Sequence, residues 1–138
     1  MKNFNFITLQ VKCPHCGTSL MDGKHKIEDA PSIKLNILLG NKRGSINLSS
    51  VYGSYNVNSE IDLISDEIGV FSCPHCRAEI TSENLCKTCQ APMAEMLLDM
   101  GGKIHFCTRK GCLKHSVEFE DLALAIKKFY DDYDQYTG

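Results

Sequence analysis

The residues in this chain whose type and spacing could do chemistry are its eight cysteines, which fall into four close pairs. Three pairs have the spacing Cys-x2-Cys and the fourth has Cys-x4-Cys: Cys13/Cys16, Cys73/Cys76, Cys86/Cys89 and Cys107/Cys112. Two cysteines this close can turn both sulfur atoms inward on a tight loop, and two such loops complete a tetrahedral site with Zn–S distances of about 2.3 Å. Four loops therefore predict two metal sites, each holding one Zn²⁺ ion.

The setting of the cysteines favours metal binding over disulfide formation. Eight cysteines in 138 residues lie below the roughly 8–10% that is typical of a disulfide scaffold. Residues 1–12 lack the apolar core of a signal peptide, and no run approaches the roughly 18 apolar residues that span a bilayer. We therefore expect a cytoplasmic protein with no membrane segment, in which thiols stay reduced and paired cysteines bind metal.

The segment between the third and fourth pairs indicates how these two pairs meet. Residues 94–99 and 103–106 have strand character and flank Gly101 and Gly102, which predicts a β-hairpin. Such a hairpin carries the chain from one cysteine loop back to the next, and the unit resembles a zinc ribbon. The resemblance implies one shared metal, in what we call site 2: Cys86, Cys89, Cys107 and Cys112.

By elimination, the first two pairs form the other site, which we call site 1: Cys13, Cys16, Cys73 and Cys76. Both loops read Cys-Pro-His-Cys, and the first continues with Gly17, as zinc ribbons do, whereas the second has Arg77 there. Site 1 would close over an inserted β-rich lobe. A competing arrangement joins the second pair to the third, and the first pair to the fourth.

Histidines near the cysteines offer alternative ligands. His105 or His115 could replace one cysteine in site 2, because three cysteines and one histidine also make a tetrahedral site. Otherwise His105 points outward on its strand and His115 is solvated. His15 and His75 lie inside the Cys-Pro-His-Cys loops, where we expect them to be exposed.

The elements that must position these loops are mostly strands. Residues 33–37 and 46–48 alternate apolar and polar side chains, and residues 40–44 between them predict the turn of a hairpin. Further strands are expected at residues 51–57, 61–64 and 68–71, with a turn at Asn58-Ser59. Residues 119–133 instead predict an amphipathic helix, whose apolar side chains are Leu122, Ile126, Phe129 and Tyr133.

The expected fold class is a small β-rich metal-binding protein, in which zinc ribbons carry an antiparallel β insertion and a C-terminal α-helix. Residues 1–80 would form an N-terminal ribbon-like unit with the inserted lobe at about 27–67. Residues 81–115 would form the C-terminal ribbon, and residues 116–138 the amphipathic helix and tail. The helix could pack on the sheet or dock on a protein partner.

Charge weighs against nucleic acid as the partner. Many zinc ribbons belong to transcription and translation proteins, which makes a nucleic-acid-binding regulator the alternative function. The formal net charge is, however, −2, and eight metal-bound thiolates make the loaded protein more acidic. Nucleic-acid binders neutralise phosphates with Lys and Arg and usually have a basic domain. We therefore expect a protein partner.

Redox chemistry is the second alternative. Cys-Pro-His-Cys is also the active-site tetrapeptide of oxidoreductases with the thioredoxin fold, but no βαβ pattern surrounds either copy here. A rubredoxin-like iron site uses the same four thiolates, although the cysteines here lack the aromatic-rich core of rubredoxin, so zinc is favoured over iron. Four cysteines also close the metal's coordination shell, whereas catalytic zinc needs an open position. The sequence thus favours a non-catalytic accessory or adaptor protein with structural zinc sites.

Overall fold

The computed structural model describes residues 8–51, 54, 56–64, 66–112 and 115–119, and the secondary structure of these residues consists of β-strands alone. The strands in chain order are β1 (Val11–Lys12), β2 (Met21–Ile27), β3 (Ala30–Leu39), β4 (Lys42–Leu48), β5 (Val57–Ser59), β6 (Val70–Ser72), β7 (Thr81–Leu85), β8 (Pro92–Leu98), β9 (Gly102–Cys107) and β10 (His115–Phe119). No helix capable of crossing a membrane occurs in these residues.

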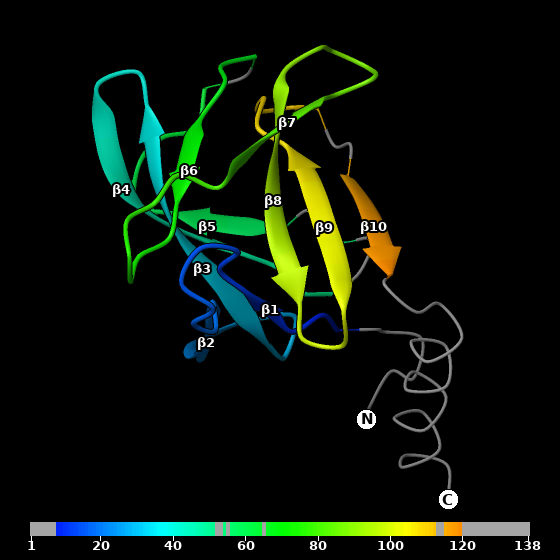
Figure 1. Ribbon diagram of the computed structural model, residues 1–138. Coiled ribbons are helices and arrows are strands. Elements are labelled where there is room, and N and C mark those ends of the chain that lie inside the picture. The colour runs from blue at the N-terminus through cyan, green and yellow to red at the C-terminus, as the bar shows by residue number, and fades with distance from the viewer. Residues whose placement is uncertain (1–7, 52–53, 55, 65, 113–114, 120–138) are drawn as a thin grey trace, which may run out of the picture.

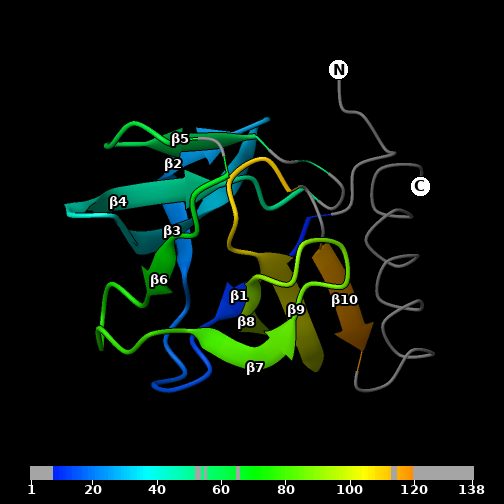
Figure 2. The same ribbon diagram turned by 90° about the horizontal axis from the view of Figure 1, so that it is seen from above.

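The strands form two five-stranded antiparallel sheets, which lie on opposite sides of the molecule in Figures 1 and 2. One sheet has the order β2-β3-β4-β5, and β6 also pairs with β3. The other sheet contains β8-β9-β10, and both β7 and β1 pair with β8. Each sheet therefore receives one short strand, β6 or β1, from the other half of the chain.

The two halves of the chain repeat the same order of elements. In repeat 1 a short strand, a Cys-Pro-His-Cys loop and four further strands follow one another as β1 to β5, and repeat 2 does the same as β6 to β10. The short strand of each repeat pairs with the third strand of the other repeat, β1 with β8 and β6 with β3. The repeats thus exchange their first strands reciprocally.

Backbone contacts confirm that the repeats are equivalent in detail. Three backbone hydrogen bonds of repeat 1 have a counterpart in repeat 2. Leu20 N to Val11 O matches Ile80 N to Phe71 O, both at 3.0 Å, and Lys34 N to Leu20 O matches Glu95 N to Ile80 O, both at 2.8 Å. Leu9 N to Ser50 O (2.8 Å) matches Gly69 N to Thr108 O (2.9 Å). The hydroxyls of Ser50 and Thr108 likewise donate to the carbonyls of Pro31 (2.6 Å) and Pro92 (2.7 Å).

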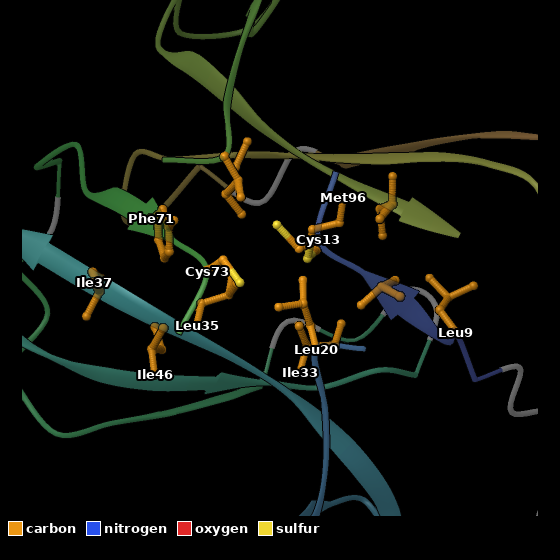
Figure 3. Packing of buried hydrophobic residues seen from close by; sticks show 14 of the residues in the cluster. Leu9, Cys13, Leu20, Ile33, Leu35, Ile37, Ile46, Phe71, Cys73 and Met96 are labelled. Atoms are coloured by element: carbon orange, nitrogen blue, oxygen red, sulfur yellow. The ribbon is translucent and has the colours of Figure 1, made fainter. Parts of the chain in front are cut away.

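One hydrophobic core lies between the sheets and draws on both repeats. Alternate residues of β3 and β8 point into it, which is the period-two burial expected of half-buried strands. The buried side chains of these two strands are Ile33, Leu35 and Ile37 in β3, and Ala94, Met96 and Leu98 in β8. Cys13 and Cys73 are completely buried in the same cluster, near Leu20 and Leu35 (Figure 3). Part of site 1 is therefore core.

Both predicted hairpins are confirmed. β3 pairs with β4 around Gly40, and β8 pairs with β9 around Gly101. Gly40 and Gly101 have φ of +63° and +96°, a left-handed conformation that side chains disfavour, which explains glycine at these turns. The predicted turn at Asn58-Ser59 is wrong, because both residues lie in β5, and residues 61–64 form no strand.

The expected C-terminal α-helix, and with it the expected fold class, is corrected by the structure. The described part of the chain contains no helix, and residues 115–119 form β10, paired with β9 in the register Val117 to Ile104. Edge pairing beside β9 therefore includes Phe119, the first residue that the helical spacing had assigned to the helix. Residues 120–133 of that expected helix lie outside the described residues.

Candidate metal centres

Site 1 forms where the two repeats cross. Its cysteines lie on the loop between β1 and β2 and on the loop between β6 and β7, and each loop runs from one sheet to the other. The structure brings all four sulfur atoms within 4.8 Å of one another: Cys13, Cys16, Cys73 and Cys76. Between the two loops, the Sγ–Sγ distances are 3.7 Å for Cys13–Cys76 and 3.8 Å for Cys16–Cys73.

Local hydrogen bonds shape each loop of site 1 around its first cysteine. In the first loop, the backbone N–H groups of His15 and Cys16 point at Cys13 Sγ, at 3.3 and 3.5 Å. Those of His75 and Cys76 point at Cys73 Sγ at the same distances. Backbone N–H groups directed at a sulfur atom stabilise its thiolate form, which is the form that binds metal, so the conformation of both loops favours metal binding.

Arg77 takes the conformation that Gly17 takes in the first loop. The φ angles are +65° for Arg77 and +73° for Gly17, and each residue donates its N–H to the carbonyl of the first cysteine of its loop. The departure from glycine noted in the sequence therefore leaves the loop geometry intact. It does so at a conformational cost, because L-residues other than glycine disfavour this region by about 1–2 kcal/mol.

Each loop of site 1 presents one buried and one exposed sulfur. Burial raises the pKa of Cys13 to about 11, whereas hydrogen bonds from Thr18 lower the pKa of exposed Cys16 to about 6. In this loop Cys16 is therefore the thiolate near neutral pH, and Cys13 loses its proton when metal binds. Metal binding to such a site releases protons and weakens as the pH falls.

Site 2 lies within repeat 2 and joins two of its connections. Cys86 and Cys89 belong to the connection from β7 to β8, and Cys107 and Cys112 bound the loop that follows β9. The Sγ–Sγ distances between the two connections are 3.7 Å for Cys86–Cys112 and 3.4 Å for Cys89–Cys107. Gln90, with φ of +68°, holds the position that Gly17 and Arg77 hold in site 1.

Arg109 is the charged neighbour of site 2, and sequence reasoning gave it no role at this site. Its backbone N–H lies 3.5 Å from Cys107 Sγ, and the nearby Cys89 thiol raises the pKa of its guanidinium. The N–H of Ala91, together with the Arg109 side chain, lowers the pKa of Cys89 to about 6. Burial raises the pKa of Cys107. A basic residue inside the Cys-x4-Cys loop was the sequence signal for this contact.

The histidines are not members of either cluster in the described part of the chain. His105 is 4% exposed, and its Nε2 lies 3.1 Å from Glu95 Oε1 and 3.2 Å from Asn84 Nδ2. This ring nitrogen therefore contacts Glu95 and Asn84 rather than a cysteine. His15 and His75 are exposed, as predicted, and His15 Nε2 donates to Glu79 O at 3.0 Å. The side chain of His115 lies outside the described residues.

The sulfur positions fit a tetrahedral metal ion. A tetrahedron with Zn–S bonds of about 2.3 Å has edges of about 3.8 Å, and the four Sγ–Sγ distances between facing loops span 3.4 to 3.8 Å. None of the eight cysteines, all of which the structure describes, is joined in a disulfide. The two clusters can therefore hold two metal ions. That they do so, and that the metal is zinc, remain predictions.

Comparisons with protein-family models, with curated proteins and with solved structures found no match for this chain. The resemblance to zinc ribbons therefore rests on the cysteine spacing and on the geometry of the two clusters.

Proposed function

We propose that the protein is a non-catalytic zinc-binding adaptor of zinc-ribbon character, in which two structural Zn²⁺ ions hold a protein-interaction surface in shape. The observation that carries the proposal is the place of site 1. Two of its sulfur atoms belong to the core, and its loops join both sheets. A metal ion there would connect the two repeats directly, which is the role of structural zinc in small domains.

The ligand set supports a structural rather than a catalytic role. Four thiolates around each ion close the coordination shell, and catalytic zinc needs one position for water or substrate. Cys13 and Cys73 are 0% exposed, so the inner side of site 1 is closed to solvent. Zinc is preferred to iron because Zn²⁺ commonly occupies closed four-cysteine sites in cytosolic folds, without a need for redox chemistry.

An apolar surface supports a protein partner. It lies beside the segment that joins β5 of repeat 1 to β6 of repeat 2, which we call the linker. Ile64, Ile68 and Val70 are 46, 41 and 37% exposed within one short segment. The same segment borders an apolar cavity of about 170 Å³ between the sheets, lined in part by Leu63 and Gly69. Exposed apolar side chains gathered next to a cavity are typical of surfaces that receive a partner's side chain.

The metal part of the proposal is tested by chelation and by Cys73→Ser. Because site 1 lies in the core, we expect either treatment to abolish cooperative folding, measured by far-UV circular dichroism and thermal unfolding. Unchanged unfolding of a chelator-treated protein shown to contain no metal would contradict it.

The adaptor part is tested by the double variant Ile64→Ser/Ile68→Ser. We expect unchanged metal content and folding but loss of the protein that co-purifies with wild type from the native source. Leu85→Ser is the control, because Leu85 is 56% exposed on β7 instead. Retention of the partner by the double variant, or binding of nucleic acid rather than protein at low salt, would contradict this assignment.

A further inference from the structure

Arg109 connects site 2 to the linker that leads into the second loop of site 1. Its Nη1 donates to the carbonyl of Asp66 at 2.8 Å, and its backbone N–H points at Cys107 Sγ at 3.5 Å. Its side chain also lies close enough to the Cys89 thiol for that group to raise the pKa of the guanidinium. Its Nε is buried and has no hydrogen-bond partner among the described residues. Arg109 thus contacts a cysteine of site 2 through its backbone and the linker through its side chain, and that side chain has a buried donor available for a charged sulfur atom.

The linker is fastened to the Cys107–Cys112 loop by backbone hydrogen bonds as well. The N–H of Asp66 donates to Lys110 O at 2.9 Å, the N–H of Lys110 donates to Glu67 O at 2.8 Å, and Gly69 N donates to Thr108 O at 2.9 Å. Strand β6 begins at the next residue and runs directly into Cys73 of site 1. The position of the Cys107–Cys112 loop therefore sets the position of a site 1 ligand.

A charged residue at this point is specific to repeat 2. Val51 takes the equivalent place in repeat 1, where it bridges Thr8 as Arg109 bridges Ile68. Valine can provide the backbone bridge but no charge. The difference between arginine and valine matches the presence of site 2. Four thiolates around a divalent ion leave a net charge of −2, which a nearby arginine can stabilise. In the described residues, repeat 1 has no such cluster at this position.

We propose that Arg109 is a positioning residue that stabilises the metal-bound thiolate of Cys89 and transmits the order of site 2 to Cys73, so that the two sites bind metal as a coupled pair. The inference rests on the proposed metal binding and deepens it. Partners of metal ligands typically contribute 10–100-fold to affinity. Coupling between sites is reciprocal, so metal in site 1 also favours metal in site 2.

Co²⁺ titration tests the role of Arg109, because thiolate-to-cobalt charge-transfer absorption reports both binding and the charge on sulfur. In Arg109→Met we expect the Co²⁺ affinity of site 2 to fall about 10-fold or more, with a shifted charge-transfer band. Arg109→Lys should recover part of the affinity. Arg109→Gln keeps a donor for Asp66 but no charge, and it provides a second measurement if Arg109→Met does not fold. Lys110→Met removes an equal charge from the adjacent residue and should behave as wild type.

The coupling is tested with Cys112→Ser, which removes a ligand of site 2. We expect the Co²⁺ affinity of site 1 to fall in this variant, and adding Arg109→Met to it should lower that affinity little further. Equal affinities of wild type, Arg109→Met and Arg109→Gln for both ions, or an unchanged site 1 in Cys112→Ser, would overturn the inference while leaving the metal sites in place. Wild type that binds no Co²⁺ would overturn the metal function and the inference together.

Discussion

In each repeat, the connection between the second and third strands contacts the segment that follows the fourth strand, and the two repeats hold these segments together by different chemistry. In repeat 2, Cys89 lies against Cys107, and Cys112 completes site 2. In repeat 1 the corresponding connections meet at Glu28, whose carboxylate accepts hydrogen bonds from Ser49 Oγ at 2.7 Å and from Ser54 Oγ. Ser49 and Ser54 have the spacing of Cys107 and Cys112, and Ser49 follows β4 as Cys107 ends β9. A carboxylate with two hydroxyls thus stands where the other repeat gathers thiols.

The length of the first connection explains the difference. In repeat 1, β2 turns into β3 through Glu28 and Asp29, whose φ angles of +58° and +63° make a tight two-residue hairpin turn. In repeat 2 the chain between β7 and β8 is longer and includes both Cys86 and Cys89. Hydrogen bonds suffice to hold a tight turn, whereas a longer connection loses more entropy on ordering and gains more from a metal ion.

The largest difference is expected between Cys107→Ala and Ser49→Ala, which change corresponding positions. Cys107→Ala should remove the ion of site 2 and destabilise the protein by on the order of 4 kcal/mol or more, because a structural metal is lost. Ser49→Ala removes one hydrogen bond to a carboxylate and should cost about 1–3 kcal/mol. Urea unfolding of both variants measures the difference. Equal losses would show that site 2 contributes no metal-binding energy.

A smaller, pH-dependent effect is expected for Glu28→Gln. Hydrogen bonds from Ser54 and Ser49 lower the pKa of Glu28 below its ordinary value of 4.5, so the native state favours the carboxylate. Its contribution is therefore present above the unfolded pKa and is lost as the pH falls through the lower, folded pKa. The stability difference between wild type and Glu28→Gln should shrink on acidification. A difference that stays constant from neutral pH to pH values below 4 would contradict this account of the repeat 1 closure.

The smallest effects are expected at the matched loop positions of site 1. Arg77→Gly should stabilise the protein by up to about 1 kcal/mol, since glycine relieves the positive φ but gains entropy when unfolded. Gly17→Ala should destabilise by about 1 kcal/mol for conformational reasons alone, because an added Cβ meets nothing within 4 Å. Thermal unfolding of the metal-loaded variants measures both. A destabilised Arg77→Gly would mean that the Arg77 side chain makes a stabilising contact.

Sequence reasoning reached those features that depend on local patterns. The close cysteine pairs, Gly40 and Gly101 at turns and the alternation in β3 are all properties of short segments, which is why the hairpins were predictable. The same reasoning suggested which loops meet, and the structure groups the sulfur atoms accordingly. The exposure of His15 and His75 also followed from their place inside tight loops.

Features that depend on long-range pairing were out of reach. The two copies of Cys-Pro-His-Cys and the two Ala-Pro dipeptides at Ala30 and Ala91 are the visible traces of the repeat, but the exchange of β1 and β6 is a tertiary property. β2 and β7 are polar and irregular, with register shifts against their partners, so they lack strand alternation. β10 is an edge strand that pairs with β9, and it includes Phe119, the residue at which the helical spacing begins.

The central claim is that the eight cysteines bind two metal ions in two separate clusters, and native mass spectrometry of the purified protein tests it most directly. We predict a mass increase that corresponds to two zinc ions per chain, with one ion lost in Cys107→Ala and the other retained. A wild-type protein of unmodified mass that is folded and carries no metal would contradict the account.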